Sequence, residues 1–255
     1  MNFYFLASNS FLKSTLTIPK FQNSGKTQND LNLFKADIYK NHWKVEYAEC
    51  NEDDFFWTIS SNKKNKNSVY FLATNEESKN IVFANTLCNL NSFTNTSPDY
   101  RANLEVINHF GAVSSYQSEF PFIMTQKLGS IYSDCGVLTA KNAKKVGVFL
   151  RSIYTKPIKE KVSLYLYDNK SNKLLQTFKV SLNEMCYVDL TSFKDVLATS
   201  FIYAKDYLGI PIYLVDYEDE GLSFEHTHPP HESIYGENRF HLVNKLKDKA
   251  NEKVS

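Results

Sequence analysis

Short runs in which hydrophobic and polar residues alternate recur along most of the chain, and polar turns separate them. The clearest run is 162–167 (Val-Ser-Leu-Tyr-Leu-Tyr), where aliphatic residues alternate with Ser and Tyr. Because successive side chains of a strand point to opposite faces, this run predicts a strand with one buried face. Residues 168–173 (Asp-Asn-Lys-Ser-Asn-Lys) are a polar tip, and residues 174–182 return as a second apolar run. The two runs therefore predict an antiparallel hairpin.

The same criterion predicts strands over much of the rest of the sequence. The ranges are 3–7, 16–19, 43–48, 55–60, 68–73, 81–85, 103–108, 111–125, 144–154, 185–190, 201–204, 212–217 and 222–228. Residues 22–35 are rich in polar side chains and predict a loop. Residues 191–197 predict one short helical turn, with Thr191 or Ser192 as its N-cap. An acidic turn at 216–221 predicts that the last two strands form a hairpin.

The spacing of the apolar residues changes near the end of the chain. Phe240, Val243 and Leu246 lie three apart and lysines occupy the other positions, which predicts an amphipathic helix. The fold class expected is therefore all-β and mainly antiparallel, β-sandwich-like, with a short C-terminal α-helix. The C-terminal half resembles immunoglobulin-like or fibronectin-like sandwiches in architecture only. We expect a β meander over 1–135, a sandwich over 136–236 and the helix over 237–255.

Composition excludes several classes of function. The chain of 255 residues carries 29 basic and 28 acidic side chains, which disfavours a nucleic-acid surface. It has eight glycines, with neither a Gly-x-Gly-x-x-Gly motif nor a Walker loop, which disfavours nucleotide cofactors. No apolar run reaches the roughly 20 residues that span a bilayer, and the N-terminus lacks the basic start of a signal peptide. We therefore expect no membrane span and a cytoplasmic location.

The strongest candidate for metal chemistry is residues 221–236, because four of the six histidines lie between His226 and His241. In an extended strand His226 and His228 would continue the apolar face of the preceding residues. Pro229-Pro230 would end that strand and stiffen the chain before His231 and Glu232. Imidazole and carboxylate groups suit a divalent metal such as Zn, Fe or Mn. The candidate ligands are His226, His228, His231 and Glu232. The alternative is that these histidines are structural.

The spacing His226-x-His228-x3-Glu232 also resembles the first motif of the cupin family. In that family two histidines and a glutamate bind a metal inside a small β-barrel. The resemblance covers only residues 221–236. Gly236 comes earlier than in the cupin pattern, and no second motif with Pro-x-Gly before a histidine follows. The family assignment is therefore not carried over to this chain.

A second candidate site lies in residues 111–125, where hydroxyl, amide and carboxylate side chains stand beside aromatic ones. Tyr116, Gln117 and Glu119 could donate or accept hydrogen bonds from a polar ligand. Ser114 or Ser115 near His109 raises the alternative of a catalytic serine, which the missing Gly-x-Ser-x-Gly elbow disfavours. The remaining interpretation is a strand with one solvated face.

Three functions stay open, and the sequence does not decide whether the protein is an enzyme. The favoured one is a non-enzymatic binding or structural β-sandwich protein, since aromatic residues make up 15% of the chain. Aromatic side chains on a sheet suit carbohydrate, which we expect first, or a protein partner. The second is a metal-dependent enzyme that uses the histidine cluster with one divalent metal. The third is a subunit of a protein assembly, including a homo-oligomer.

Overall fold

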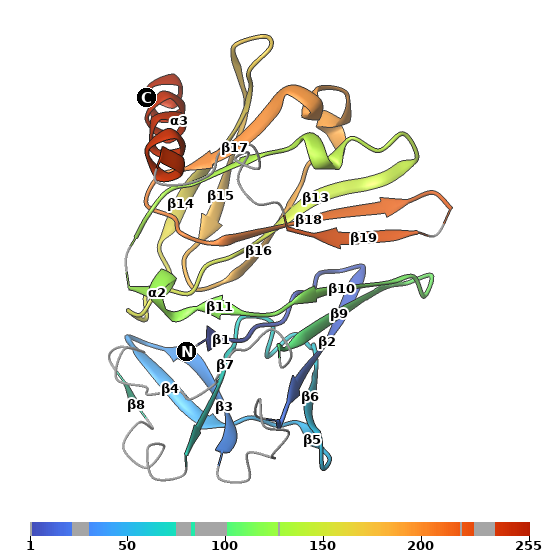
Figure 1. Cartoon of the computed structure of the whole chain (residues 1–255), viewed down its shortest axis with the longest axis vertical. Coiled ribbons are helices and arrows are strands. Elements are labelled where there is room, and N and C mark those ends of the chain that lie inside the picture. The colour runs from blue at the N-terminus through green and yellow to red at the C-terminus, as the bar shows by residue number, and fades with distance from the viewer. Residues whose placement is uncertain are drawn as a thin grey trace. The chain divides into compact units, whose positions relative to one another are not determined.

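The computed structural model describes residues 2–21, 31–74, 83–84, 101–126, 128–219, 221–226 and 238–255 (Figure 1). The chain forms two compact units. Unit 1 comprises Met1–Lys127, Ile153–Lys159 and Asn183–Met185. Unit 2 comprises Leu128–Ser152, Glu160–Leu182 and Cys186–Ser255. The chain therefore passes from one unit to the other five times, first at Leu128.

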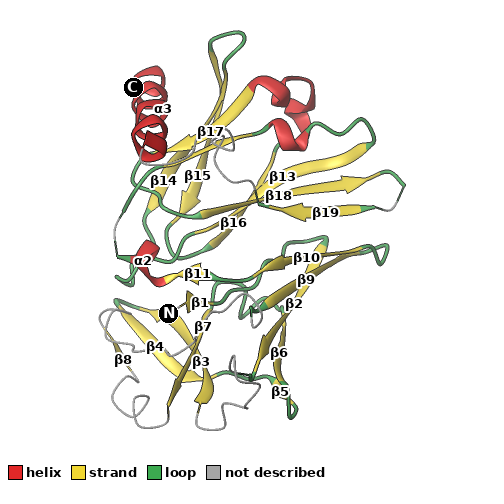
Figure 2. Ribbon diagram, in the orientation of Figure 1, coloured by secondary structure: helices red, strands yellow, loops and turns green. Residues whose placement is uncertain are grey.

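The predicted class, mainly antiparallel β with a C-terminal helix, is confirmed (Figure 2). The strands and helix of unit 1 follow the chain in order. They are β1 (Asn2–Phe3), β2 (Leu12–Pro19), β3 (Leu31–Tyr39), β4 (His42–Tyr47), β5 (Asn51–Glu52), β6 (Phe56–Ser60), β7 (Val69–Thr74), β8 (Phe83–Ala84), β9 (Asn103–Asn108), β10 (Val113–Gln117), β11 (Phe120–Pro121) and α2 (Phe122–Thr125). They form a five-stranded sheet in the order β10-β9-β2-β6-β5, a four-stranded sheet in the order β7-β3-β4-β8, and the pair β1-β11.

Alternation explains why β2 lies in the middle of its sheet. Leu12, Ser14, Leu16 and Ile18 are buried, while the residues between them are exposed or half-buried. Strand β2 pairs with β9 on one side and β6 on the other, so both of its backbone edges are hydrogen-bonded. The alternating burial along β2 shows that one face of this sheet packs into the core and the other is accessible to solvent.

Two predictions for unit 1 were wrong in part. The loop expected over 22–35 contains the start of β3, because its apolar side chains at 31, 33, 34 and 36 are buried while Asn32 and Lys35 are half-buried. The single strand expected over 111–125 is instead β10, β11 and α2. The buried Ser118 separates β10 from β11. Its hydroxyl accepts a hydrogen bond from the Phe5 N–H at 2.9 Å and donates one to the Phe5 carbonyl oxygen.

Unit 2 has two four-stranded sheets. Its elements are β12 (Ile131–Asp134), η3 (Gly136–Leu138), β13 (Ala143–Arg151), β14 (Lys161–Asp168), β15 (Lys173–Ser181), β16 (Met185–Asp189), η4 (Thr191–Thr199), β17 (Ser200–Ala204), β18 (Ile210–Tyr217), β19 (Leu222–Glu225) and α3 (Asn238–Val254). The sheet orders are β12-β17-β14-β15 and β16-β13-β18-β19. The predicted hairpins β14-β15 and β18-β19 and the helical turn at η4 are confirmed. The predicted N-cap, Thr191 or Ser192, was wrong, because the cap residue is Leu190 and no side chain caps the turn.

The core of unit 2 is densest around β13. Every residue from Val146 to Arg151 is buried, so both faces of this strand are covered. Gly147 permits the close approach of β16, because an added Cβ would lie 2.6 Å from the carbonyl oxygen of Val188. The Tyr213 hydroxyl on β18 donates a hydrogen bond to Ser133 Oγ on β12 at 2.7 Å, which links the two sheets.

Helix α3 lies along the sheet that contains β14 and β17 (Figure 1). Ala250 is buried against Tyr167, Phe201 and Tyr203. Lys247 donates to the carbonyl oxygen of Ser130, and burial lowers the pKa of its ammonium group. The described part of the helix is therefore held by Ala250 and Val254 against aromatic rings and by the hydrogen bond of Lys247.

Asp168 ends β14 and organises the turn to β15. Its carboxylate accepts hydrogen bonds from the Ser171 N–H at 2.9 Å, the Lys170 N–H at 3.2 Å and the Thr199 hydroxyl at 2.5 Å. The hydrogen bonds from Ser171 and Thr199 hold the pKa of this carboxyl well below its usual range.

We expect Asp168→Asn to lower the melting temperature at pH 7 by several degrees. A carboxyl whose pKa is lower in the folded state stabilises the fold above its ordinary pKa of about 3.9, and the stabilisation is lost as the pH falls through the folded pKa. The difference in melting temperature between the wild type and Asp168→Asn should therefore become smaller as the pH falls from 4 to 2. Melting curves over pH 2–7 measure this, with the exposed Asp195→Asn as control. A difference that stays constant with pH would contradict the assignment.

Candidate functional site

The structure describes only the first member of the predicted metal cluster. Strand β19 ends at Glu225 rather than at the predicted residue 228, and His226 follows it half-buried. His228, His231 and Glu232 lie outside the described residues. Within the described part of the chain, no group of three or more His, Cys, Asp or Glu side chains could hold a metal ion. The predicted metal site stays a prediction.

The second predicted site lies at the edge strand β10 of the five-stranded sheet. Tyr116 and Gln117 are successive strand residues, so their side chains point to opposite faces. Gln117 is exposed and accepts a hydrogen bond from Arg101 Nη1, while Glu119 follows the strand and is half-buried. The backbone therefore does not bring Tyr116 and Gln117 to one face, and a ligand role for the three residues stays a prediction.

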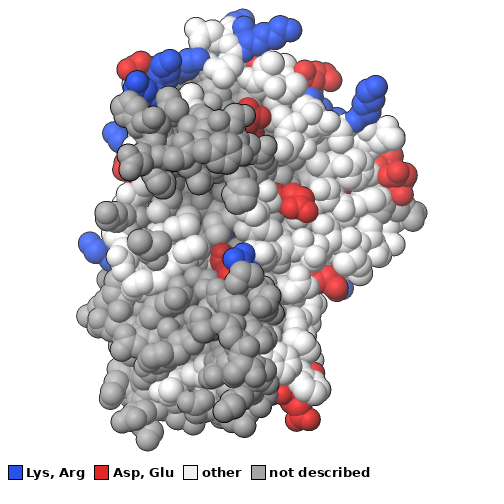
Figure 3. Space-filling view, viewed as in Figure 1, with Lys and Arg blue, Asp and Glu red and all other residues white. Residues whose placement is uncertain are grey.

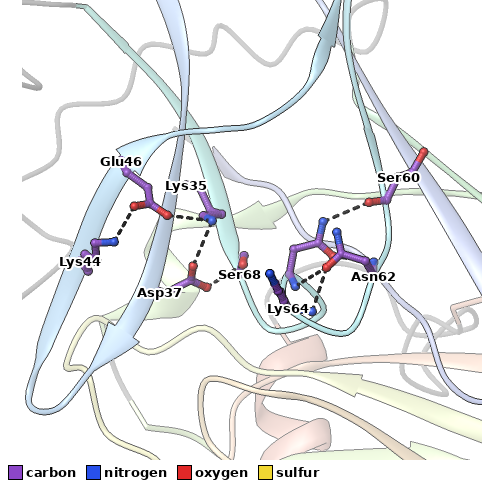
Figure 4. Close-up of polar contacts among 9 residues, drawn as sticks. Lys35, Asp37, Lys44, Glu46, Ser60, Asn62, Lys64 and Ser68 are labelled. Carbon is purple, nitrogen blue, oxygen red and sulfur yellow. Dashed lines mark hydrogen bonds and ion pairs between the residues drawn. The ribbon is translucent and has the colours of Figure 1, made fainter.

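A network of charged side chains covers one face of the β3-β4 hairpin (Figure 4). Lys35 Nζ lies 2.8 Å from Glu46 and 3.5 Å from Asp37, and Lys44 Nζ lies 2.7 Å from Glu46. Ser68 Oγ donates to Asp37 at 2.6 Å. Hydrogen bonds from Lys35 and Lys44 lower the pKa of Glu46. Each charge faces an opposite charge across the strands, which is the arrangement of a stabilising ladder.

The polar contacts beside this network in Figure 4 build a turn. Asn65 Oδ1 accepts the Asn62 N–H at 2.7 Å, and Asn62 Oδ1 accepts the Lys64 N–H at 2.8 Å. Asn65 Nδ2 donates to the Ser60 carbonyl oxygen at 3.0 Å. These side chains satisfy backbone groups between β6 and β7, so their role is to shape the loop.

The most promising binding surface is a cluster of three phenylalanines on unit 1, which we call the aromatic patch: Phe21, Phe55 and Phe56. Phe55 is 54% exposed and Phe56 is 36% exposed. The ring centre of Phe21 lies 5.7 Å from that of Phe55 and 6.1 Å from that of Phe56, the latter pair edge-to-face. Exposed rings this close together form a contiguous apolar surface.

A hydrogen-bonded turn fixes the aromatic patch. Asp53 Oδ1 accepts the N–H groups of Phe55 and Phe56, each at 2.7 Å, and these bonds lower the pKa of the Asp53 carboxyl. The Phe55 carbonyl oxygen accepts the Lys20 N–H at 2.9 Å, which joins the turn to the end of β2. These hydrogen bonds hold the backbone that carries Phe55 and Phe56 on both sides of the turn.

Charged groups border the aromatic patch. Lys20 Nζ lies 2.7 Å from Glu52 Oε1, donates to the Asp53 carbonyl oxygen, and stands 5.0 Å from the ring centre of Trp57. Trp57 itself is buried. The site thus combines apolar rings with the Lys20 ammonium group and the carboxylates of Glu52 and Asp53.

Sequence reasoning missed the aromatic patch, although a signal was present. Residues 55–57 are three aromatic side chains in succession at the start of a predicted strand. Alternation sends neighbours to opposite faces, so at least one ring had to point away from the core when Trp57 points into it. Phe21, which completes the cluster, belongs to a distant part of the chain and gave no such signal.

Comparison with known proteins identifies no relative: no family model, curated protein or solved structure matches this chain. No helix within the described residues is long and apolar enough to cross a membrane. On the face shown in Figure 3, acidic and basic side chains are interspersed.

Proposed function

We propose that this protein is a non-enzymatic binding protein, that the aromatic patch is its ligand surface, and that the ligand is a carbohydrate. The observation that carries the proposal is the pair of exposed phenylalanine rings, Phe55 and Phe56, on a hydrogen-bonded turn, with the half-buried ring of Phe21 packed against both. The C–H faces of a sugar ring are apolar and stack on aromatic rings, while the hydroxyl groups need donors and acceptors at the rim. Glu52, whose side chain is 57% exposed, supplies a carboxylate acceptor beside the rings.

We also propose that unit 2 is a β-sandwich of immunoglobulin-like architecture. Its two four-stranded antiparallel sheets support this assignment, as does the buried hydrogen bond of Tyr213 with Ser133 between them. In such a scaffold the sheets bury a common core and leave turns and edges for recognition.

The test is a glycan array followed by affinity measurement for the tightest glycan. Phe55→Ala/Phe56→Ala should weaken binding at least tenfold, because two stacking surfaces are lost. The control is Tyr39→Ala/Phe110→Ala, which removes two other exposed rings, 53% and 45% accessible. Both variants should keep the wild-type melting temperature within a few degrees. A wild-type protein that binds no glycan, or equal losses in the two variants, would contradict the proposal.

The alternative function is a metal-dependent enzyme, and the observation that favours it is the clustering of histidines at 226–231. Zn, Fe or Mn would bind His226, His228 and His231 or Glu232, with one open position for water or substrate. Protein purified without an affinity tag would then contain nearly one metal ion per chain, and His226→Ala/His228→Ala would contain none. Equal metal contents in the two proteins would count against this alternative.

A further inference from the structure

Strand β15 is the longest edge strand that the structure describes. It has nine residues and ends its sheet, with β14 as its neighbour on one side. The other strands that end sheets in the described residues have two to six residues. An edge strand presents a row of backbone N–H and C=O groups to which another extended chain can pair.

The side chains of β15 are unusually accessible on both faces. Only Val180 is buried, and the other eight residues are exposed or half-buried. Leu174 is 45% exposed, and Leu175 and Phe178 are half-buried. A strand added beside β15 would cover these three side chains, and their burial would add to the backbone hydrogen bonds.

The hairpin that carries this edge is basic. Residues 161–181 contain four lysines and one aspartate, a net charge of +3. The aspartate is Asp168, whose carboxylate is occupied by the turn. In the view of Figure 3, blue side chains gather over the tip of the β14-β15 hairpin seen in Figure 1. Lys173 and Lys179 stand on β15 itself, with Lys179 Nζ 2.7 Å from Ser163 Oγ.

We infer that β15 is a docking strand for an extended, acidic segment of a partner protein, which joins the sheet by strand addition. The backbone edge supplies affinity, and pockets and charges along it supply selectivity. The register of β15 with β14, in which Leu175 is the extra residue of a bulge, places Lys173 with Phe178 on one face and Lys179 with Leu174 on the other. On each face of the added strand, a carboxylate would lie opposite the lysine and an apolar side chain opposite Phe178 or Leu174. A second copy of this chain is a poor partner, because two hairpins of charge +3 repel each other.

The experiment uses the full chain and three fluorescent heptapeptides. The first is Glu-Val-Thr-Thr-Val-Glu-Thr, in which the two Glu side chains point to opposite faces, as Lys173 and Lys179 do. The second has Lys in place of Glu, and the third is the first with alternate backbone nitrogens methylated. Methylation removes the donors on one edge of the peptide without changing its charge. We expect the first peptide to bind at least tenfold more tightly than the other two, and to slow amide exchange within residues 173–181. Equal binding of the methylated peptide, or protection elsewhere, would overturn the inference.

Two charge-reversal variants give an independent test. Lys173→Glu/Lys179→Glu should weaken binding of the acidic heptapeptide at least tenfold. The matched control is Lys63→Glu/Lys64→Glu, two exposed lysines in unit 1 that change the net charge equally. Equal losses in both variants would show general electrostatic attraction and overturn the inference. Light scattering tests whether a second copy of this chain occupies the edge. If the wild type is a dimer and Lys173→Glu/Lys179→Glu is a monomer, the partner is a second copy and the proposed occupant is wrong.

Discussion

Trp43→Ala is expected to lower the free energy of unfolding by about 3–5 kcal/mol. The Trp43 side chain is 1% exposed in the core of unit 1. Its Nε1 donates to the carbonyl oxygen of Thr155 at 2.7 Å, across 112 residues of sequence. Truncation leaves a cavity and removes the donor of a buried carbonyl group, and both effects destabilise the fold.

Urea denaturation measures the effect, and two further variants separate its parts. Trp43→Phe keeps most of the side-chain volume but lacks the N–H donor. Its free energy of unfolding should therefore lie between those of the wild type and Trp43→Ala. Tyr39→Ala, at a position 53% exposed on the same strand pair, should change the free energy by less than about 1 kcal/mol. If Trp43→Ala and Tyr39→Ala lower the free energy of unfolding by the same amount, the buried indole does not anchor unit 1.

Gly147→Ala should destabilise the protein by about 3 kcal/mol, although it adds one methyl group. The new Cβ would lie 2.6 Å from the Val188 carbonyl oxygen and 2.6 Å from the Tyr187 hydroxyl. The first of these atoms belongs to the backbone of the neighbouring strand β16, which cannot rotate away. The sheet would have to part locally, and hydrogen bonds between β13 and β16 would lengthen.

Gly129→Ala is the matched control, because there the nearest atom to an added Cβ is the side-chain Cδ1 of Leu208 at 3.4 Å. This change should alter the free energy of unfolding by less than about 0.5 kcal/mol. Both values come from chemical denaturation under the same conditions. A destabilisation by Gly147→Ala no larger than that of the control would mean that β13 and β16 separate at little cost.

Local periodicity predicted the elements whose partners lie close by in the sequence. The hairpins β14-β15 and β18-β19 follow from alternating runs that flank a polar tip, since their partners are adjacent in the chain. The change of spacing after residue 237 predicted α3 for the same reason. These features require only information within about twenty residues.

Features that depend on distant partners could not be predicted in this way. Strand β2 pairs with β9 across some 90 residues, and no local pattern specifies that choice. Arg151 carries a charge, yet it is fully buried, and no local pattern indicates this. Phe21 meets Phe55 only because the two lie at neighbouring strand ends. The start of β3 was predicted as a loop because polar residues in 31–35 weaken the strand pattern. Burial of its apolar side chains against the rest of the unit outweighs this weak strand propensity.

Because the chain passes repeatedly between the two units, unit 1 cannot complete its folding until later residues have been synthesised. Unit 1 needs residues 153–159 and 183–185, which follow much of unit 2 in sequence. Asn67 Oδ1 accepts the Met185 N–H at 3.0 Å, and Asn183 Oδ1 accepts the Tyr154 N–H at 2.6 Å. A nascent chain that stops at residue 135 therefore contains Trp43 but not its acceptor. The N-terminal unit cannot be finished first on the ribosome, so both units should reach their native packing only after residue 185 has been translated.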